Sequence, residues 1–294
     1  MVYYCFPLVS EEAAFLKGSS ISARLATVDG SSGIRAPCIH PYIRSQYSVR
    51  RLPEIELNTG IRIPILYEDR AVLAIDKPPG WMLIPHSWDR TNRNLQLALR
   101  SSINAGDRWA RSRGLKFLRF VHRLDAETTG VLLFAKSRGA LRTFTELFAS
   151  RKMLKVYLAV VRGIPSRNRW ECELSLAPDP KSIGRMKIDP RNGKPAKTCF
   201  QVLQTQANTT LVEARPLTGR THQIRVHLAA AGHAVVGDRL YPESVDPRRS
   251  ATTELALRGI SLTYIDPFLR RQVCIQAPDA EFKKRFGFAS AAQA

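Results

Sequence analysis

The chain of 294 residues lacks several features that would assign it to common classes of protein. It has no run of about 18 apolar residues, so the sequence predicts no membrane span. Its apolar start, MVYYCFPLV, has no basic segment before it, so a cleaved signal peptide is not expected. The five cysteines are odd in number and form no C-x-x-C pair, which argues against a disulfide framework and a zinc site. Free thiols in a reducing compartment fit better, and we expect a cytoplasmic protein.

Negative charge is also scarce. The chain has 25 Asp and Glu residues against 45 Lys and Arg residues, and its net charge is +20. Such an excess indicates a polyanionic partner, with nucleic acid as the first candidate. A merely soluble basic protein and a protein that binds anionic membranes are the alternatives. Since no basic amphipathic helix is evident, the membrane alternative has little support.

The first 60 residues differ in composition from the rest of the chain. Gly, Ser and Pro recur there, and Arg44, Arg50 and Arg51 add positive charge. This composition predicts a partly disordered basic extension over residues 1–60. Residues 61–288 are expected to form the folded domain, and residues 289–294 a disordered tail.

The folded part predicts more strands than helices. Short apolar runs bounded by turn residues predict strands at residues 71–75, 117–121, 131–135, 155–161, 199–203 and 210–214. Helices are expected at residues 94–100, after an N-cap at Ser137, and at residues 221–231 before Gly232. Residues 178–197 are expected to form an exposed basic loop. The pattern indicates an α+β domain on a mixed or antiparallel sheet.

The segment VHRLDAETTGVLLFAK, residues 121–136, places a carboxylate in a polar turn between two apolar segments. Asp125 follows His122 and Arg123 directly. An Asp in such a turn is often only a turn former. A carboxylate held between rigid strands is also a suitable position for a catalytic group.

A second polar segment, TGRTHQIRVHL, covers residues 218–228. Its Arg220 and Arg225 could simply line a solvated helix and bind phosphate. His222 and His227 are five residues apart with no Glu between them, which is a poor spacing for one face of a helix. The sequence therefore predicts no metal site.

These segments resemble motifs of the RluA-type pseudouridine synthases. That family reads H-R-L-D before a Thr-Ser-Gly-like turn, and T-G-R-T-H-Q-I-R-V-H residue for residue. Similar turns occur at residues 76–80, 193–196 and 237–242, so five motifs follow the family's order between residues 65 and 287. The chain departs from the pattern at Asp76, where Asn is usual, at Thr129 in place of Ser, and at Arg258 in place of His. The small S4 domain that the family often carries is not evident in residues 1–60.

The resemblance implies a fold and a reaction. The fold is a mixed, largely antiparallel sheet with flanking helices and a central basic cleft. The reaction is the isomerisation of uridine to pseudouridine in ribosomal or transfer RNA by a monomer, without cofactor or metal. A carboxylate suits such chemistry, since carboxylates attack anomeric carbons in glycoside cleavage.

The resemblance also assigns roles to individual residues. Asp125 is the nucleophile or base, Arg225 pairs with it, and Tyr157 stacks on the target uracil and can assist proton transfer. Arg123 fills the gap that the displaced uridine leaves. His122 is expected to structure the turn by hydrogen bonds of its ring. The wider set of RNA-binding candidates is Arg123, His122, Arg220, His222 and Gln223.

Other functions remain as alternatives. A non-catalytic RNA-binding or ribosome-assembly protein could use the same fold, although Asp125, Tyr157 and Arg225 argue for catalysis. A carbohydrate hydrolase using Asp125 is disfavoured by the charge of +20. Asp125 and Glu127 are too close in one turn to form the acid and base of a glycosidase. H-R-L-D also matches part of a kinase catalytic loop, but the Gly-rich loop, D-F-G and V-A-I-K are missing.

Overall fold

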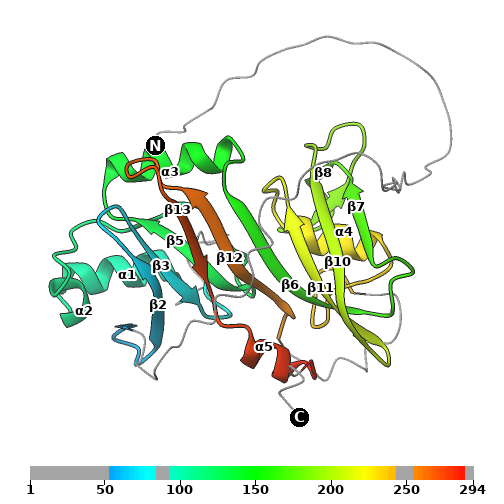
Figure 1. Ribbon diagram of the computed structural model, residues 1–294, viewed down its shortest axis with the longest axis horizontal. Helices are drawn as coiled ribbons and strands as arrows, with labels where there is room; N and C mark the ends of the chain where they lie inside the picture. Colours follow the sequence, from blue (N-terminus) through cyan, green and yellow to red (C-terminus); the bar gives the residue numbers. More distant parts are fainter. Residues whose placement is uncertain (1–52, 84–92, 243–253, 289–294) are drawn as a thin grey trace, which may run out of the picture.

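The computed structural model describes residues 53–83, 93–242 and 254–288 (Figure 1). Most of its strands belong to one large sheet: β1 (Glu54–Glu56), β2 (Arg62–Glu68), β3 (Val72–Lys77), β4 (Arg119–Phe120), β5 (Thr129–Ala135), β6 (Leu154–Arg162), β7 (Arg169–Glu173), β10 (Lys197–Gln206), β11 (Thr209–Pro216), β12 (Leu257–Ile265) and β13 (Gln272–Gln276). A separate hairpin contains β8 (Leu176–Pro178) and β9 (Met186–Ile188). The helices are α1 (Leu95–Asn104), α2 (Arg108–Arg111), α3 (Arg138–Ala149), α4 (Gln223–Ala230) and α5 (Ala280–Arg285).

The large sheet runs in the order β1-β2-β3-β5-β12-β6-β11-β10-β7, with β13 beside β12 and β4 beside β5. Among the described strands, β5 and β12 form the one parallel pair, and every other pair is antiparallel. The expected α+β fold with a mixed, largely antiparallel sheet is therefore confirmed. No helix in these residues is both long and apolar enough to cross a bilayer.

The half of the sheet that contains β2, β3 and β5 has a hydrophobic core on each face. One core includes residues of α1 and α2, and the other includes residues of α3 and β13 (Figure 1). Burial on both faces explains why β5 is apolar along its length, since all seven of its residues are buried. Ser137 caps α3 as predicted, and its hydroxyl accepts a hydrogen bond from the backbone N–H of Ala140 at 3.1 Å.

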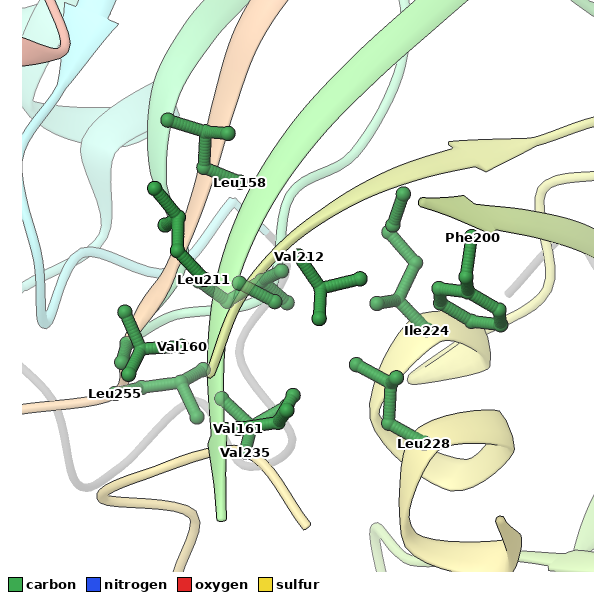
Figure 2. Packing of buried hydrophobic residues seen from close by; sticks show 14 of the residues in the cluster. Leu158, Val160, Val161, Phe200, Leu211, Val212, Ile224, Leu228, Val235 and Leu255 are labelled. Carbon is green, nitrogen blue, oxygen red and sulfur yellow. The ribbon is translucent and has the colours of Figure 1, made fainter. Parts of the chain in front are cut away.

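The other half of the sheet packs against α4. Ile224 and Leu228 are one helical turn apart, so they lie on the same face of α4 and contact the core beside Val212 and Phe200 (Figure 2). Burying each of these apolar side chains contributes about 1.5–3 kcal/mol relative to exposure. This packing fixes the position of α4 against β10 and β11, and with it the polar residues at the start of the helix.

The ordered domain starts earlier than the predicted boundary at residue 61. Strand β1 pairs with β2, and Ile55 at its centre is fully buried in the core. The strand has only three residues and two of them are exposed Glu, so its apolar signal is a single residue. The predicted extension is thus shorter than 60 residues. Residues 1–52, where an S4 domain was sought, and the predicted tail at residues 289–294 lie outside the described part of the chain.

Two other predictions also need correction. The basic loop expected at residues 178–197 contains most of the β8–β9 hairpin, in which Pro178 pairs with Met186. The strand expected at residues 117–121 is reduced to Arg119–Phe120. The ladder with β5 ends because the N–H of Leu133 donates to Nε2 of His122, and the side chain of Gln96 occupies the opposite edge, where it donates to the carbonyl of Leu118 and accepts the N–H of Phe120. A side-chain amide thus takes the backbone bonds that a neighbouring strand would otherwise make.

Candidate active site

A cavity of about 560 Å³ lies between the two halves of the sheet. Its lining includes the turn before β5, the end of α3 with the loop that follows it, strand β6, the loop that joins β11 to α4, and Leu257 of β12. These segments bring together all the candidate site residues, namely His122, Arg123, Asp125, Tyr157, Arg220, His222, Gln223 and Arg225. Asp125 and Arg225 are 100 residues apart in the sequence, so only the fold makes them neighbours.

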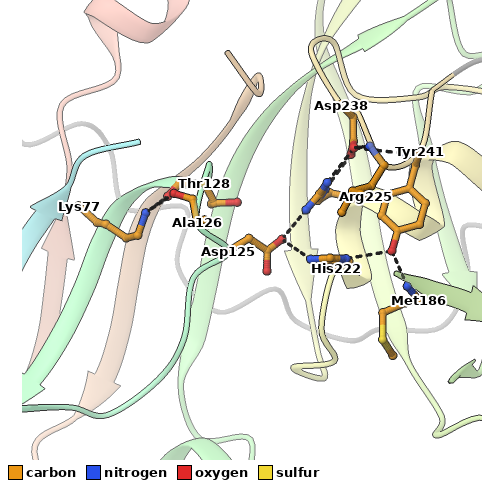
Figure 3. Close-up of polar contacts among 10 residues, drawn as sticks. Lys77, Asp125, Ala126, Thr128, Met186, His222, Arg225, Asp238 and Tyr241 are labelled. Atoms are coloured by element: carbon orange, nitrogen blue, oxygen red, sulfur yellow. Dashed lines mark hydrogen bonds and ion pairs between the residues drawn. The ribbon is translucent and has the colours of Figure 1, made fainter. Parts of the chain in front are cut away.

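Arg225 binds two carboxylates at once (Figure 3). Its Nη1 donates to Oδ2 of Asp125 at 3.1 Å, while its Nε and Nη2 donate to the two oxygens of Asp238, both at 2.7 Å. The expected pairing of Arg225 with Asp125 is present, but the bidentate partner is Asp238. That side chain is fully buried, and the side chain of Asp125 is 21% exposed. Asp238 therefore anchors the guanidinium, and Asp125 faces the cavity.

The contacts of Asp238 fix Arg225 more firmly than one ion pair would. Oδ1 of Asp238 also accepts the backbone N–H groups of Leu240 and Tyr241. Burial alone lowers the pKa of Arg225, but the hydrogen bonds and charge of Asp238, followed by the charge of Asp125, raise it overall. Sequence reasoning identified the turn at residues 237–242 and gave Asp238 no role, because only the fold shows which cation a buried carboxylate meets.

Lys77 holds the turn that carries Asp125. Its Nζ donates to three carbonyl oxygens, those of Ala126 at 2.6 Å and of Pro78 and Thr128 at 3.0 Å. Figure 3 shows Lys77 with Ala126 and Thr128. Lys77 is fully buried, and burial lowers the pKa of its amine to about 7. Two of these carbonyls follow Asp125 by one and three residues, so Lys77 fixes the backbone that directs the carboxylate. Sequence reasoning placed Lys77 at the end of a strand and did not predict this contact.

His222 adopts the left-handed backbone conformation, with φ of 54°, directly before α4. The predicted helix start at residue 221 is therefore two residues early. Nδ1 of His222 lies 2.9 Å from the hydroxyl of Tyr241, and its Nε2 lies 3.8 Å from Oδ2 of Asp125. Burial is the main cause that lowers the pKa of His222 below its ordinary value. The ring is thus a neutral neighbour of the carboxylate.

Tyr157 lies on β6 opposite Gly259 of β12. A Cβ atom at Gly259 would lie 3.3 Å from the Tyr157 ring, so the glycine leaves room for the aromatic side chain. Burial, and then the charge of Asp125, raise the pKa of Tyr157 well above its ordinary value. The hydroxyl therefore stays protonated, and the half-buried ring offers an aromatic face to the cavity.

Two candidates direct their polar atoms into the protein instead. Nε2 of His122 accepts the N–H of Leu133 at 3.2 Å, and its ring stacks on Phe148. The amide of Gln223 makes four hydrogen bonds, to Lys197, Thr198, Thr218 and Arg220, and the residue is 4% exposed. Nε2 of His122 and the amide of Gln223 are therefore engaged within the protein, and both residues form part of the cavity wall.

Four basic side chains of the lining can face a ligand, and one of them is the exposed Arg151 that follows α3. Arg123 is exposed next to the turn of Asp125. Arg220 is half-buried and uses its Nε to donate to the carbonyl of Pro195. Lys155 donates to the carbonyl of Thr218 at 3.0 Å, and burial lowers the pKa of its amine to about 8. No three His, Cys, Asp or Glu side chains in the described ranges gather in a geometry that would hold a metal.

Two of the departures from the family pattern meet in space. Nη2 of Arg258 lies 2.6 Å from Oδ2 of Asp76, although 182 residues separate them. Nε of Arg258 also donates to the carbonyl of Pro278. Each departure therefore supplies the partner that the other needs, and Arg258 packs against β3 without entering the cavity lining.

Comparison with known proteins decides the family. The family model described as RNA pseudouridylate synthase matches residues 71–230, which include Asp125, Tyr157 and Arg225. The chain belongs to this family. It is thus an RNA pseudouridine synthase, an isomerase that acts on RNA.

Relatives of this synthase agree with the assignment. The ribosomal large subunit pseudouridine synthase C of Escherichia coli strain K12 is 32% identical over 269 residues, covering 88% of this chain and 79% of the relative. The Pasteurella multocida protein of the same name is 35% identical over 235 residues, covering 76% of this chain and 67% of the relative. The structure of human RNA pseudouridylate synthase domain containing 1 is 29% identical, covers 76% of this chain and 85% of its own, and superposes with a TM-score of 0.61.

Proposed function

We propose that this synthase isomerises a uridine of ribosomal RNA, with Asp125 as the nucleophile or base. The observation that carries the proposal is the position of Asp125, a carboxylate that faces the cavity and is held by Arg225 at 3.1 Å. The reaction breaks the bond from N1 of uracil to C1′ of the ribose and joins C5 to C1′, while the hydrogen on C5 leaves as a proton and N1 takes up a proton. A carboxylate near the sugar can either attack C1′ or remove a proton from C2′.

The hydrogen bonding of Asp125 supports a defined reactive oxygen. Arg225 donates to Oδ2, and His222 approaches the same oxygen. No side chain in the described part of the chain donates to Oδ1 at hydrogen-bonding distance. We infer that Oδ1 faces the ribose, while Oδ2 keeps the carboxylate in place.

The remaining lining suits a nucleotide that has left its stack. The ring of Tyr157 offers a platform for uracil, since base stacking on an aromatic face contributes about 1–3 kcal/mol. Arg123 is exposed beside Asp125 and can occupy the space that the uridine vacates. Arg220 and Lys155 line the cavity and can bind phosphate, and the net charge of +20 on the chain adds to the attraction for RNA.

The names of the relatives favour ribosomal RNA over transfer RNA as the substrate. The test is to map pseudouridines in total RNA from cells with and without the gene, and then to treat the unmodified RNA with purified protein. We expect a ribosomal RNA position to lose its pseudouridine without the gene and to regain it with the protein. A site restored only in transfer RNA would overturn the substrate. An unchanged map with tight RNA binding would favour the non-catalytic alternative.

A further inference from the structure

A chain of polar contacts leads from β9 to the carboxylate of Asp125 (Figure 3). The backbone N–H of Met186 donates to the hydroxyl oxygen of Tyr241 at 2.7 Å. That oxygen lies 2.9 Å from Nδ1 of His222, whose Nε2 lies 3.8 Å from Oδ2 of Asp125. Each contact limits where the next hydrogen can lie, so the contacts together favour one tautomer of the histidine.

The direction of each donor follows from the first contact. A backbone N–H only donates, so the oxygen of Tyr241 accepts from Met186, and Nδ1 of His222 is the acceptor that the described contacts offer to the hydroxyl's own hydrogen. A neutral imidazole carries one hydrogen, and when Nδ1 accepts from Tyr241 that hydrogen is on Nε2. The opposite tautomer would direct the lone pair of Nε2 at an anionic oxygen and leave the Tyr241 hydroxyl without this acceptor.

The surroundings keep the ring neutral and in place. Asp125 and Asp238 favour the charged form of His222, Arg225 and Arg123 oppose it, and burial, as the largest cause, lowers its pKa overall. Tyr241 is 5% exposed, the guanidinium of Arg225 lies 5.3 Å above its ring, and the guanidinium of Arg185 also lies over it at 5.4 Å. The Tyr241 hydroxyl that contacts His222 is therefore held in place by packing of the Tyr241 ring as well as by the hydrogen bond from Met186.

The backbone supplies an independent observation. A φ of 54° is rare for residues other than glycine, and residues in such conformations concentrate at functional sites. Here it turns the chain directly before α4 and directs the imidazole toward the cavity.

We propose that His222 is a positioning residue for Asp125, held by Tyr241 in the tautomer whose Nε2–H points at Oδ2 of the carboxylate. The proposal rests on the proposed function, in which Asp125 is the catalytic carboxylate. At 3.8 Å the contact is longer than a hydrogen bond, and such contacts tighten when substrate fills a site. Arg225 and His222 then donate to the same oxygen and leave Oδ1 for the ribose.

The tautomer is tested directly by nitrogen NMR of the full chain labelled with ¹⁵N-histidine, with the His222 signals assigned from their loss in His222→Asn. We expect Nε2 to carry the hydrogen in the wild type, and Tyr241→Phe to give a mixture of tautomers. Tyr67→Phe is the matched control, because its hydroxyl contacts Asp69 far from the cavity. A wild-type ring with its hydrogen on Nδ1, or a Tyr241→Phe ring identical to the wild type, would overturn the proposal.

Two substitutions of His222 separate positioning from a backbone role. Asn tolerates the left-handed conformation better than Gln, but its amide ends where Nδ1 lies and cannot reach Asp125. Gln strains the backbone and places an amide N–H near the position of Nε2. If the donor matters, turnover in His222→Asn should fall by about ten- to 100-fold with KM for RNA unchanged, and His222→Gln should keep more activity. Faster turnover by His222→Asn than by His222→Gln would show that only the backbone conformation matters.

Folding is checked for each variant by its melting temperature, and Tyr241→Phe keeps the kinetic test available if His222→Gln is unstable. Its turnover should lie between those of the wild type and His222→Asn, and wild-type turnover would contradict the proposal.

If the wild type modifies no RNA, the proposed function fails. The NMR result still decides the position of His222, because Asp125→Asn should weaken the preference for the Nε2–H tautomer only if that hydrogen faces the carboxylate.

Discussion

At the scale of single residues, the guanidinium of Arg225 is divided between a buried carboxylate and an accessible one. Asp238 takes the fork of two parallel hydrogen bonds, and Asp125 takes the remaining Nη1. The buried partner holds the arginine rigidly, so the catalytic candidate receives a positive charge in a fixed place without using both of its oxygens. A lysine cannot make this division, because its ammonium is a single point of charge.

Replacing Arg225 by Lys should therefore harm folding as well as turnover. The variant breaks the fork to a fully buried Asp238, so the free energy of unfolding should fall by about 3 kcal/mol. Arg62→Lys is the control, since Arg62 and Glu56 form an exposed pair on β1 and β2 and its change should stay below about 0.5 kcal/mol. Urea unfolding of both variants makes the comparison, and equal stabilities would show that the fork contributes nothing.

His122 should make the folded state sensitive to acid. Its Nε2 accepts a backbone N–H, and burial, with the charge of Lys155, lowers its pKa from 6.5 to about 3. Below pH 6.5, His122 therefore binds a proton in the unfolded chain and stays unprotonated in the folded chain. The free energy of unfolding falls as the pH decreases toward 3. Gln offers an acceptor at the same place and does not titrate. Between pH 7 and pH 5 the wild type should lose roughly 2 kcal/mol more than His122→Gln, measured by urea unfolding. An equal loss would contradict the buried neutral ring.

At the scale of elements, the parallel contact of β5 with β12 depends on two facing glycines. Gly130 pairs with Gly259, and a Cβ atom on Gly130 would lie 2.0 Å from the Gly259 carbonyl oxygen. Gly130 also has φ of +106°, which side chains rarely adopt. This close approach joins the strand after Asp125 to the strand beside Tyr157, and so sets the distance between the two halves of the site.

Gly130→Ala should separate these strands. We expect a loss of at least about 2 kcal/mol in the free energy of unfolding, together with loss of turnover. Gly139→Ala is the matched control, because Gly139 lies in α3 with no atom within 4 Å of an added Cβ. That change should stabilise the protein by about 0.5–1 kcal/mol. Thermal unfolding distinguishes the two, and a neutral Gly130→Ala would show that the strands can move apart freely.

The elements differ in how far sequence alone predicts them. Strands β3, β5 and β6 were predicted because a buried strand carries an apolar run in its own residues. The three-residue β1 and the β8–β9 hairpin were missed, since each strand has only three residues and a short apolar signal. The same limit applies to the site. The family resemblance indicated Asp125, Tyr157 and Arg225, whereas the contacts of Lys77, Asp238 and Tyr241 depend on tertiary structure.

At the scale of the whole molecule, the charge of +20 should dominate the affinity for RNA. Binding should weaken linearly in a log–log plot against salt, with a slope of roughly −0.7 for each phosphate contact to single-stranded RNA. Arg123→Gln and Arg220→Gln should each make the slope shallower by about 0.7 if each binds one phosphate. Arg285→Gln is the control. Arg285 lies on α5, outside the cavity lining, and its guanidinium pairs with Glu254. Slopes that do not change at Arg123 or Arg220 would remove these residues from the RNA-binding surface.

In the proposed function, Asp125 carries the chemistry of uridine isomerisation. The most direct measurement is the release of tritium from RNA labelled at C5 of uridine, since C5 loses its hydrogen when it joins C1′. Asp125→Asn keeps the shape of the side chain and removes its charge, so it should fold and bind RNA but release no tritium, while the wild type does. Release from Asp125→Asn at the rate of the wild type would contradict the account.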